Sequence, residues 1–468
     1  MSVAAESHSR STICTRLPLA CLALAIGLTI WATPALGAPS LLRSAGGFRL
    51  SGNYTNTETI PNLETALTLA RTHALLVISQ GWQLGFEGSW DGTVSDTYFD
   101  EMMAANPRLL IFRYLNAMYD PGRAFPESWY LHNAAGHRLF NPTYGNYLMD
   151  PRSTEAYTEE DVTSQGWVQY LEYLFRKDVA RFPGVFNGGI WLDDVGGRPH
   201  VIDVVTSQPS EPVDQSGRRW TDATWEAMTT SVTARLQSET QRLVFANALL
   251  SGNCYFTGCG GDVPTGSFLS APGVDGAMAE AWLTAWYNST ARMPSILGWR
   301  QDVQMVIDAN RRGRSVQLMT APPALASTRQ IDRWRLYAYS SFLLANSGRS
   351  YFQFAPNCRP NCGGPTRTGT FEMADPLYSI DIGTPVQNAR SINAYKRARG
   401  RYFVRRYSKG KVWVNPTRRA VRIYLGRRYR LSDGRVVRWL VLRPASGQIG
   451  IAQAPDRRPH RRKKHRRP

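Results

Sequence analysis

The stretch Gly188-Gly189-Ile190-Trp191-Leu192-Asp193-Asp194-Val195 contains the pattern that decides the fold prediction. A continuous apolar run of strand length follows a helical stretch, Trp167–Arg181, and ends in two acids. Continuous apolar residues are typical of parallel strands that are covered on both faces. The stretch therefore predicts a buried parallel strand whose carboxyl end opens onto polar residues.

Short apolar runs of this kind occur eight times. They are Gly47–Gly52, Ala74–Ser79, Leu109–Leu115, Gly189–Leu192, Leu243–Ala246, Asp275–Ala279, Ser315–Met319 and Arg349–Phe354. Helices are predicted between most of them, at Leu63–Arg71 behind an Asn62 cap, Ser95–Ala105, Trp167–Arg181, Trp225–Arg242, Asp302–Arg312 and Ile331–Asn346. Eight alternations predict the α/β class and a (β/α)8 TIM barrel over residues 38–394. An open doubly wound sheet is the alternative, but no G-x-G-x-x-G or P-loop supports it. The fifth crossover, Ser251–Val274, is expected to be loop-like.

Beyond Tyr395 the pattern changes to short alternating strands. They are Tyr402–Tyr407, Lys411–Asn415, Ala420–Leu425, Arg428–Leu431, Val436–Leu442 and Gln448–Ala452. Asp433-Gly434 is a strong hairpin signal. Residues 395–454 therefore predict a small antiparallel β-sandwich domain, and the basic residues 455–468 predict a disordered tail.

The amino-terminal residues resemble a secretion signal. Arg10 and Arg16 precede the apolar run Leu17–Trp31, and Ala35-Leu36-Gly37 offers a small-residue cleavage site. A membrane anchor is the alternative, but the run is short for a bilayer span. We expect residues 1–37 to be removed, leaving a secreted monomer, extracellular, periplasmic or on the cell surface, without a transmembrane anchor.

Four cysteines remain after the signal segment and form two close pairs, Cys254/Cys259 and Cys358/Cys362. An even number of cysteines in an oxidising compartment favours disulfides. Four thiolates could instead bind zinc, but no histidine lies near them in the sequence. We expect two disulfides, no metal site and no cofactor.

Positive charge is concentrated at the carboxyl end of the chain. Lys396–Arg443 holds 17 Lys and Arg against the single acid Asp433, a net charge of +16, and the tail from Pro455 carries +7. The stated total of +19 leaves −4 for residues 1–395. This division marks a domain boundary and favours an anionic partner, such as a cell-envelope polymer, for the carboxyl-terminal region.

Acids occur at the ends of two predicted barrel strands. The fourth strand ends in Asp193 and Asp194, and the sixth is followed by Glu280. Active sites of TIM barrels lie at the carboxyl ends of the strands, and cleaving a glycosidic bond requires two carboxyl groups. We predict Asp193 as nucleophile or base and Glu280 as proton donor. Strand alternation places Asp194 on the opposite side of the strand from Asp193. Asp194 is therefore the alternative candidate for the catalytic aspartate. All three acids could instead be helix caps or ion-pair partners.

Other residues near the strand ends could bind sugar hydroxyls or stack on sugar rings. The candidates are Tyr114, Asn116, Asp150, Asn247, Gln353, Trp82 and Trp282. Each polar residue could instead stabilise a loop, and each tryptophan could be part of the core. The chain contains no G-x-S-x-G elbow and no H-E-x-x-H motif, which disfavours a serine triad and a zinc protease.

Six phrases resemble, in the same order, those of TIM-barrel proteins called hypothetical glycosyl hydrolase family 15, which is distinct from the glucoamylases that share its number. The phrases are Ile111–Asn116 (IFRYLN), Tyr147–Pro151 (YLMDP), Gly188–Val195 (GGIWLDDV), Val274–Ala281 (VDGAMAEA), Asp381–Pro385 (DIGTP) and Gly410–Pro416 (GKVWVNP), within about Phe48 to Gln448. The resemblance implies a sugar-cleaving barrel with a carboxyl-terminal β domain and no assigned substrate.

The chain is also distantly similar to endo-α-1,4-polygalactosaminidases and, in its Gly-x-x-x-Asp pattern, to amylase-type barrels. The amylase resemblance implies that Asp193 is the nucleophile. In those barrels the catalytic acid follows the fifth strand, where this chain has Asn247 instead. This difference from the amylase pattern leaves Glu280 as the candidate acid.

The leading hypothesis is a secreted glycoside hydrolase acting on a poly- or oligosaccharide. One alternative is a carbohydrate-binding barrel without turnover. Another is an adhesion protein whose basic region binds envelope polymer, extracellular DNA or lipid headgroups. The tail has no interleaved aromatic residues, so we do not expect specific nucleic-acid recognition.

Overall fold

The computed structural model describes residues 54–57, 62–78, 95–120, 122–142, 145–196, 201–214, 216–258, 263–280, 282–284, 294–320, 327–354 and 375–454. The predicted signal segment, 1–37, and the basic tail, 455–468, lie outside these residues.

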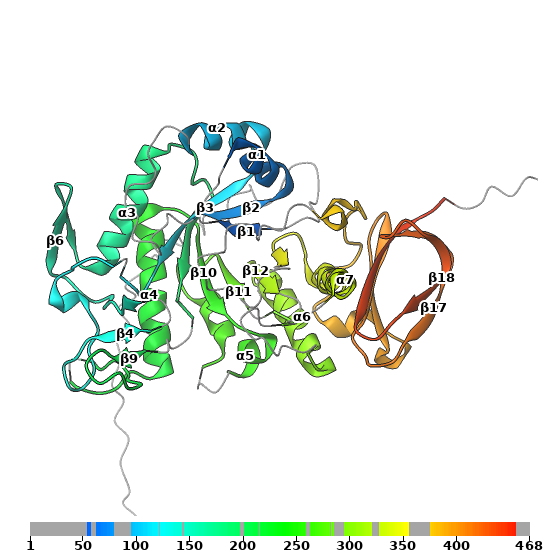
Figure 1. The fold of residues 1–468 in the computed structure, drawn as a ribbon. Coiled ribbons are helices and arrows are strands. Elements are labelled where there is room, and N and C mark those ends of the chain that lie inside the picture. Colours follow the sequence, from blue (N-terminus) through cyan, green and yellow to red (C-terminus); the bar gives the residue numbers. More distant parts are fainter. Residues whose placement is uncertain are drawn as a thin grey trace, which may run out of the picture. The chain divides into compact units, whose positions relative to one another are not determined.

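Eight parallel strands form the central sheet and follow one another in chain order (Figure 1). They are β1 (Tyr54–Thr57), β2 (Leu75–Ile78), β3 (Leu110–Asn116), β8 (Gly189–Asp193), β10 (Val244–Leu249), β11 (Gly276–Ala279), β12 (Ser315–Thr320) and β13 (Tyr351–Phe354). The outermost strands, β1 and β13, lie in contact. The sheet is therefore a nearly closed barrel, as the repeated pattern predicts.

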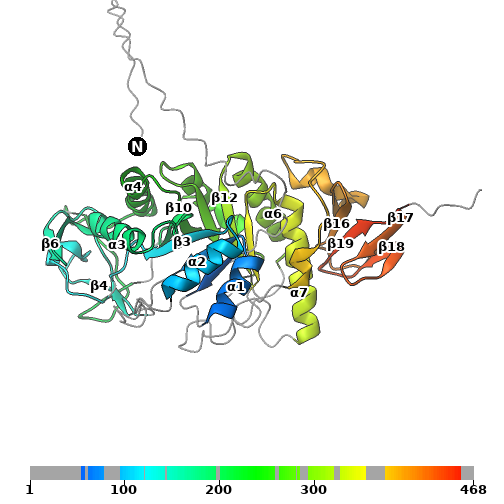
Figure 2. The ribbon, with the colours of Figure 1, turned by 90° about the horizontal axis from the view of Figure 1, so that it is seen from above.

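A helix follows each of the first seven barrel strands. These helices are α1 (Leu63–Thr72), α2 (Ser95–Ala105), α3 (Trp167–Arg181), α4 (Asp222–Thr240), α5 (Gly252–Thr257), α6 (Ile296–Arg311) and α7 (Thr328–Ala345). Figure 2 shows the longer helices lying outside the strands. The predicted cap Asn62 accepts a hydrogen bond from the backbone N–H of Thr65 at 2.8 Å, which satisfies a free amide at the start of α1.

The first and fifth barrel units differ from the sequence prediction. The first strand is Tyr54–Thr57, whereas the predicted run Gly47–Gly52 lies outside the described residues. The fifth crossover contains α5 and the 3-10 helix η4 (Thr265–Ser270). Both are too short to produce a clear helical pattern in the sequence, which explains why they were not predicted.

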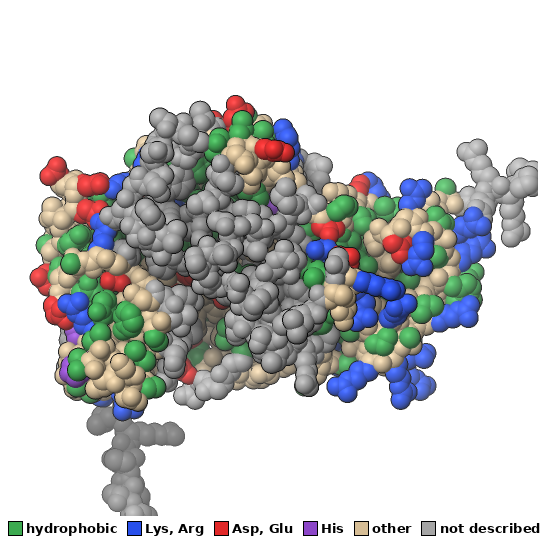
Figure 3. Space-filling model, viewed as in Figure 1, with side chains coloured by type: hydrophobic (Ala, Val, Ile, Leu, Met, Phe, Trp, Pro, Cys, Tyr) green, Lys and Arg blue, Asp and Glu red, His purple; other side chains and the backbone are tan. Residues whose placement is uncertain are grey.

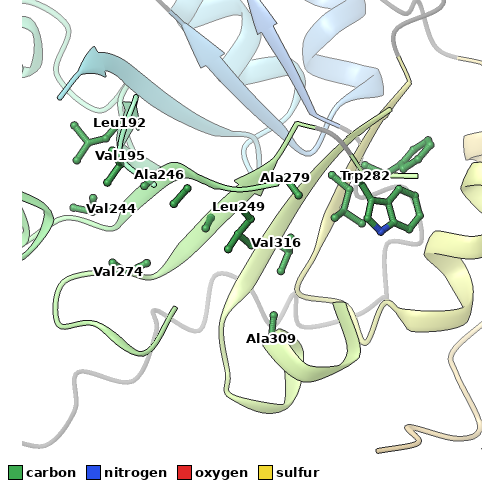
Figure 4. Packing of buried hydrophobic residues seen from close by; sticks show 14 of the residues in the cluster. Leu192, Val195, Val244, Ala246, Leu249, Val274, Ala279, Trp282, Ala309 and Val316 are labelled. Carbon is green, nitrogen blue, oxygen red and sulfur yellow. The ribbon is translucent and has the colours of Figure 1, made fainter. Parts of the chain in front are cut away.

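Strand alternation separates the barrel interior from the surface that the helices cover. Trp191, Phe245 and Met278 belong to the apolar cluster inside the barrel. Their neighbours along the strands pack outward instead, and Figure 4 shows several of these, including Leu192, Ala246 and Ala279. Because alternate residues share a face, every second residue of a barrel strand points to the interior.

A long excursion separates β3 from α3, and a shorter one separates β8 from α4. They contain the short strands β4 (Leu139–Asn141), β5 (Asn146–Tyr147), β6 (Ala156–Glu159), β7 (Val162–Gln165) and β9 (Ile202–Asp203), with the 3-10 helix η3 (Glu127–Trp129). Strand β9 pairs with β4, so the two excursions form one small sheet, β5-β4-β9.

The carboxyl-terminal domain is an antiparallel sheet of six strands, ordered β14-β15-β16-β19-β17-β18. They are β14 (Lys396–Arg397), β15 (Tyr402–Arg406), β16 (Gly410–Asn415), β17 (Val421–Leu431), β18 (Val436–Leu442) and β19 (Ser446–Ala452); the 3-10 helices η5 (Pro376–Ser379), η6 (Ile392–Tyr395) and η7 (Ala398–Gly400) precede or interrupt them. The Asp433-Gly434 turn joins β17 to β18, as predicted.

Two predicted strands, Ala420–Leu425 and Arg428–Leu431, are one long strand in the structure. Gly426 has a φ of +77°, and the pairing of β17 with β18 shifts its register between Tyr424 and Tyr429. A bulge of this kind lets a strand bend and continue beyond a turn-like sequence. The Gly-Arg-Arg segment therefore marks a bend within β17, whereas the sequence pattern predicted its end.

Candidate active site

The Asp193 carboxylate lies at the end of β8, between the two neighbouring barrel strands. The hydroxyl of Tyr114, on β3, donates to Asp193 Oδ2 at 2.6 Å. Asn247 Nδ2, on β10, donates to Asp193 Oδ1 at 2.9 Å. The backbone N–H of Asp194 donates to the same oxygen at 2.9 Å. Three donors therefore hold the carboxylate in one orientation.

Asp194 ends the strand, because its φ of +57° lies in the left-handed region. Its Oδ2 accepts a hydrogen bond from Asn116 Nδ2 at 2.6 Å. Strand alternation no longer applies beyond Asp193, so the two carboxyl groups are not separated onto opposite sides as the sequence suggested. Asp194 is instead close enough to Asp193 and Glu280 to be influenced by both charges.

The pKa of Asp194 is well above its ordinary value. Burial is the largest cause, and the negative charge of Asp193 adds to it; the Asn116 hydrogen bond opposes the shift, and Glu280 reinforces it. A carboxyl group in such surroundings keeps its proton to a higher pH than an exposed one.

Glu280 follows β11 directly and is half-buried. Gly276 and Met278 lie four and two residues before Glu280, at alternate positions that share one face of a strand. Met278 belongs to the interior cluster. The negative charge of Glu280 adds to the raised pKa of Asp194, so the two carboxyl groups are within electrostatic range of each other. Asp193 and Asp194 therefore lie side by side at the end of β8, and Glu280 lies at the end of β11, at the same carboxyl-terminal edge of the parallel sheet.

An aromatic layer fills the barrel next to these acids. The rings of Tyr114 and Trp191 stack with centroids 5.3 Å apart. Trp191 Nε1 donates to Gln317 Oε1, on β12, at 2.6 Å across the barrel. Gln317 was not among the sequence candidates. A polar residue in an apolar strand, with the same parity as interior residues, is the signal that could have found it.

The remaining candidates lie in different surroundings. Gln353, on β13, is buried. Asp150 forms an ion pair with Arg152 at 2.7 Å. Trp282 is fully enclosed, its indole N–H donates to the backbone oxygen of Asp302 at 3.1 Å, and it therefore presents no ring face to a ligand. Trp82 lies outside the described residues.

Only one of the four cysteines lies among the described residues. Cys254 is buried in α5 and is disulfide-bonded. Cys259, Cys358 and Cys362 lie outside the described residues, so both pairings stay predictions.

A cavity of about 510 Å³ is lined by residues of the two excursions and by Trp225 of α4, and none of the predicted site residues lines it. Among the described residues, no group of three or more His, Cys, Asp or Glu side chains is placed to hold a metal ion. In the same part of the chain, no helix has the length and apolar character needed to cross a bilayer.

Comparison with known proteins gives neither a matching family model nor a matching curated protein. The predicted membership of hypothetical glycosyl hydrolase family 15 and the similarity to polygalactosaminidases therefore have no support from these comparisons.

The solved structures that this chain resembles include glycoside hydrolases of several families. A family 39 glycoside hydrolase from Bacteroides cellulosilyticus WH2 is 10% identical with a TM-score of 0.46, over 87% of this chain and 82% of that one. The glucosidase II alpha subunit is 10% identical with a TM-score of 0.42, over 87% of this chain, and this chain spans only 44% of its length. An endo-β-1,6-glucanase is 10% identical with a TM-score of 0.40, over 86% and 91% of the two chains. Likenesses this distant carry no argument about activity.

Proposed function

We propose that this protein hydrolyses glycosidic bonds with carboxyl groups at the ends of β8 and β11. The observation that carries the proposal is the Asp193 carboxylate, which Tyr114 and Asn247 hold at the end of β8 beside Asp194, an acid whose pKa is raised. Glycoside hydrolysis needs one carboxyl group that donates a proton and a second that acts as nucleophile or base.

Asp193 is the proposed nucleophile or base, since its neighbours hold the carboxylate in one orientation at the strand end. Glu280 is the proposed donor of a proton to the departing glycosidic oxygen. Asp194 is the alternative donor, because its raised pKa favours the protonated form. Water supplies the hydroxyl group that ends on the anomeric carbon, and its remaining proton restores the acid.

The test compares Asp193→Asn, Asp194→Asn and Glu280→Gln on a panel of polysaccharides and on dinitrophenyl glycosides. Dinitrophenolate leaves without protonation, so a variant that lacks the acid should lose about 10²–10⁴-fold on polysaccharides but little on the aryl glycosides. A variant that lacks the nucleophile should lose activity on both kinds of substrate.

Asp332→Asn is the matched control, because this acid is exposed on α7 and pairs with Arg335. It should retain full activity. Undiminished activity in both Asp193→Asn and Glu280→Gln would contradict the proposed site. Binding of a glycan without any turnover by the wild-type protein would favour the non-catalytic carbohydrate-binding barrel.

We further propose that the chain is exported and that its basic carboxyl-terminal region retains it on anionic envelope polymer. Amino-terminal sequencing of the protein from the culture medium should find a start near Gly37 or Ala38. Deleting Pro455–Pro468 should weaken salt-sensitive retention on anionic surfaces, and unchanged retention at low salt would contradict that role of the tail.

A further inference from the structure

The outward side of the β17–β18 hairpin exposes large apolar side chains. Tyr424 is 57% exposed, Trp439 51%, Val441 59% and Val436 49%. Tyr424 lies directly opposite Trp439 in the pairing, and their ring centroids are 4.9 Å apart. Alternate residues such as Ile423 and Leu440 point the other way, into the core of the domain. The exposed rings are therefore not part of that core.

Two exposed arginines of β17 accompany these side chains, Arg422 before the Gly426 bend and Arg430 after it. Arg422 lies opposite Val441, and Arg430 lies opposite Val436. The Arg422 guanidinium lies 4.6 Å from the centroid of the Trp439 ring. We call Arg422, Tyr424, Arg430, Val436, Trp439 and Val441 the hairpin outer face. Figure 3 shows Lys and Arg side chains gathered over this end of the described chain.

The positive charge of the surrounding region is almost unopposed. Residues 396–454 contain one acid, Asp433, which pairs with Arg435 at 2.7 Å. Arg422 and Arg430 both lie in β17, whose other charged residues are also arginines. A second copy of this face would bring the same positive charge, and like charges oppose self-association.

We propose that the hairpin outer face binds an acidic polysaccharide, a polymer whose sugar rings carry carboxylate groups. Aromatic rings stack on the C–H faces of sugars, and guanidinium groups pair with carboxylates through two parallel hydrogen bonds. One ring on each of the two paired strands, with arginines on β17, suits a polymer that offers both sugar rings and negative charges. This inference rests on the proposed retention by the basic carboxyl-terminal region, for which it names a binding face, and it does not depend on the proposed hydrolysis.

The experiment measures binding of polygalacturonate, with neutral dextran of similar length as comparison, by calorimetry at 0.15 M salt. The full chain carries Asp193→Asn throughout, so that the polymer stays intact. Polygalacturonate should bind and dextran should not. Tyr424→Ala with Trp439→Ala should weaken binding at least about tenfold without altering charge. Arg422→Gln with Arg430→Gln should weaken the binding of polygalacturonate and make that binding less dependent on salt concentration.

Arg399→Gln with Arg401→Gln is the charge-matched control, because both arginines are exposed in the same domain outside the hairpin outer face. It should bind as the parent does. Circular dichroism and melting temperature check that each variant is folded.

Four outcomes would overturn the proposal. They are equal binding of dextran and polygalacturonate, equal losses in the control and the arginine variant, tighter binding of duplex DNA that does not require the two rings, and dimerisation that the ring substitutions abolish.

Discussion

At the scale of single residues, local surroundings give adjacent acids different properties. Asp193 lies at the last strand position and accepts hydrogen bonds from both neighbouring strands. Asp194 leaves the strand with a left-handed φ, and its pKa is raised by burial first and then by the negative charge of Asp193. The sequence places both acids at a strand end, but the backbone torsion that brings them together depends on how the chain leaves the barrel.

His73 is a second residue whose surroundings alter its titration. The ring is buried beyond the end of α1, and burial lowers its pKa to about 4, although a hydrogen bond to the Leu69 carbonyl opposes the shift. The folded state therefore favours the neutral ring. Stability should be fully present above the ordinary value of 6.5 and should be lost as the pH falls towards 4.

We predict that acidification from pH 6.5 to pH 4 costs roughly 3 kcal/mol of unfolding free energy through His73. Urea unfolding of the wild type and of His73→Gln at several pH values measures this contribution. The unfolding free energy of the wild type relative to that of His73→Gln should decrease as the pH falls from 6.5 to 4, and it should be constant above pH 6.5. A difference that does not vary with pH would contradict the prediction.

At the scale of secondary-structure elements, Asp302 on α6 links two segments that follow barrel strands. Its carboxylate accepts a hydrogen bond from the backbone N–H of Gly252, at the start of α5, at 2.6 Å. A second backbone bond comes from Leu283, three residues beyond Glu280. Burial outweighs these two bonds and raises the pKa of Asp302 to about 7. The side chain thus ties α6 to the segments after β10 and β11.

We predict that Asp302→Ala destabilises the protein by about 2–4 kcal/mol at pH 4, because two buried N–H groups lose their acceptor. The raised pKa means that the stability contributed by Asp302 is fully present below about pH 4 and is lost as the pH rises through about 7. The difference in unfolding free energy between Asp302→Ala and the wild type should therefore become smaller as the pH rises from about 4 to about 7.

Asp308→Ala is the control for Asp302→Ala, since this acid lies on the same helix but is partly exposed, with Arg312 and Tyr255 as partners. It should cost at most about 1 kcal/mol. Equal losses in the two variants, measured by urea unfolding, would show that Asp302 has no special structural role.

At the scale of the whole molecule, Arg405 connects the carboxyl-terminal domain to the barrel. The side chain is only 1% exposed, and it donates to the backbone oxygens of Leu343 and Asn346 at 2.8 and 2.7 Å. These oxygens lie at the end of α7, where helix carbonyls lack partners and the helix dipole favours a positive charge. The Tyr407 hydroxyl also donates to the Leu343 oxygen, at 2.5 Å.

We predict that Arg405→Met costs about 2–4 kcal/mol, because the Asn346 carbonyl group loses its donor and the Leu343 carbonyl group keeps only the Tyr407 hydroxyl. It should also reduce the cooperativity between the two domains, so that calorimetry resolves two unfolding transitions. Arg406→Met, at the exposed neighbouring position, should leave a single transition and an almost unchanged melting temperature. Identical calorimetric traces for the two variants would contradict this role of Arg405.

Most barrel strands and helices could be predicted, since their signals are local. Seven of the eight predicted strand runs overlap a barrel strand, and helix α3 has the predicted bounds. The short strands of the excursions were missed, because β5 and β9 have only two residues each and no periodicity can appear over that length. Their pairing partners are also distant in the sequence.

The sequence by itself determined the alternation of strands and helices and the placement of Asp193 and Glu280 at strand ends. It also determined the division between a barrel region of slightly negative net charge and a basic β domain. These properties follow from periodicity and composition, which a linear chain displays directly. Only the tertiary structure decided that a left-handed φ turns Asp194 out of the strand, that Trp282 is enclosed and that Tyr424 lies beside Trp439 on an exposed face. Each of these depends on which distant residues meet, and that is set by backbone torsions and packing across strands.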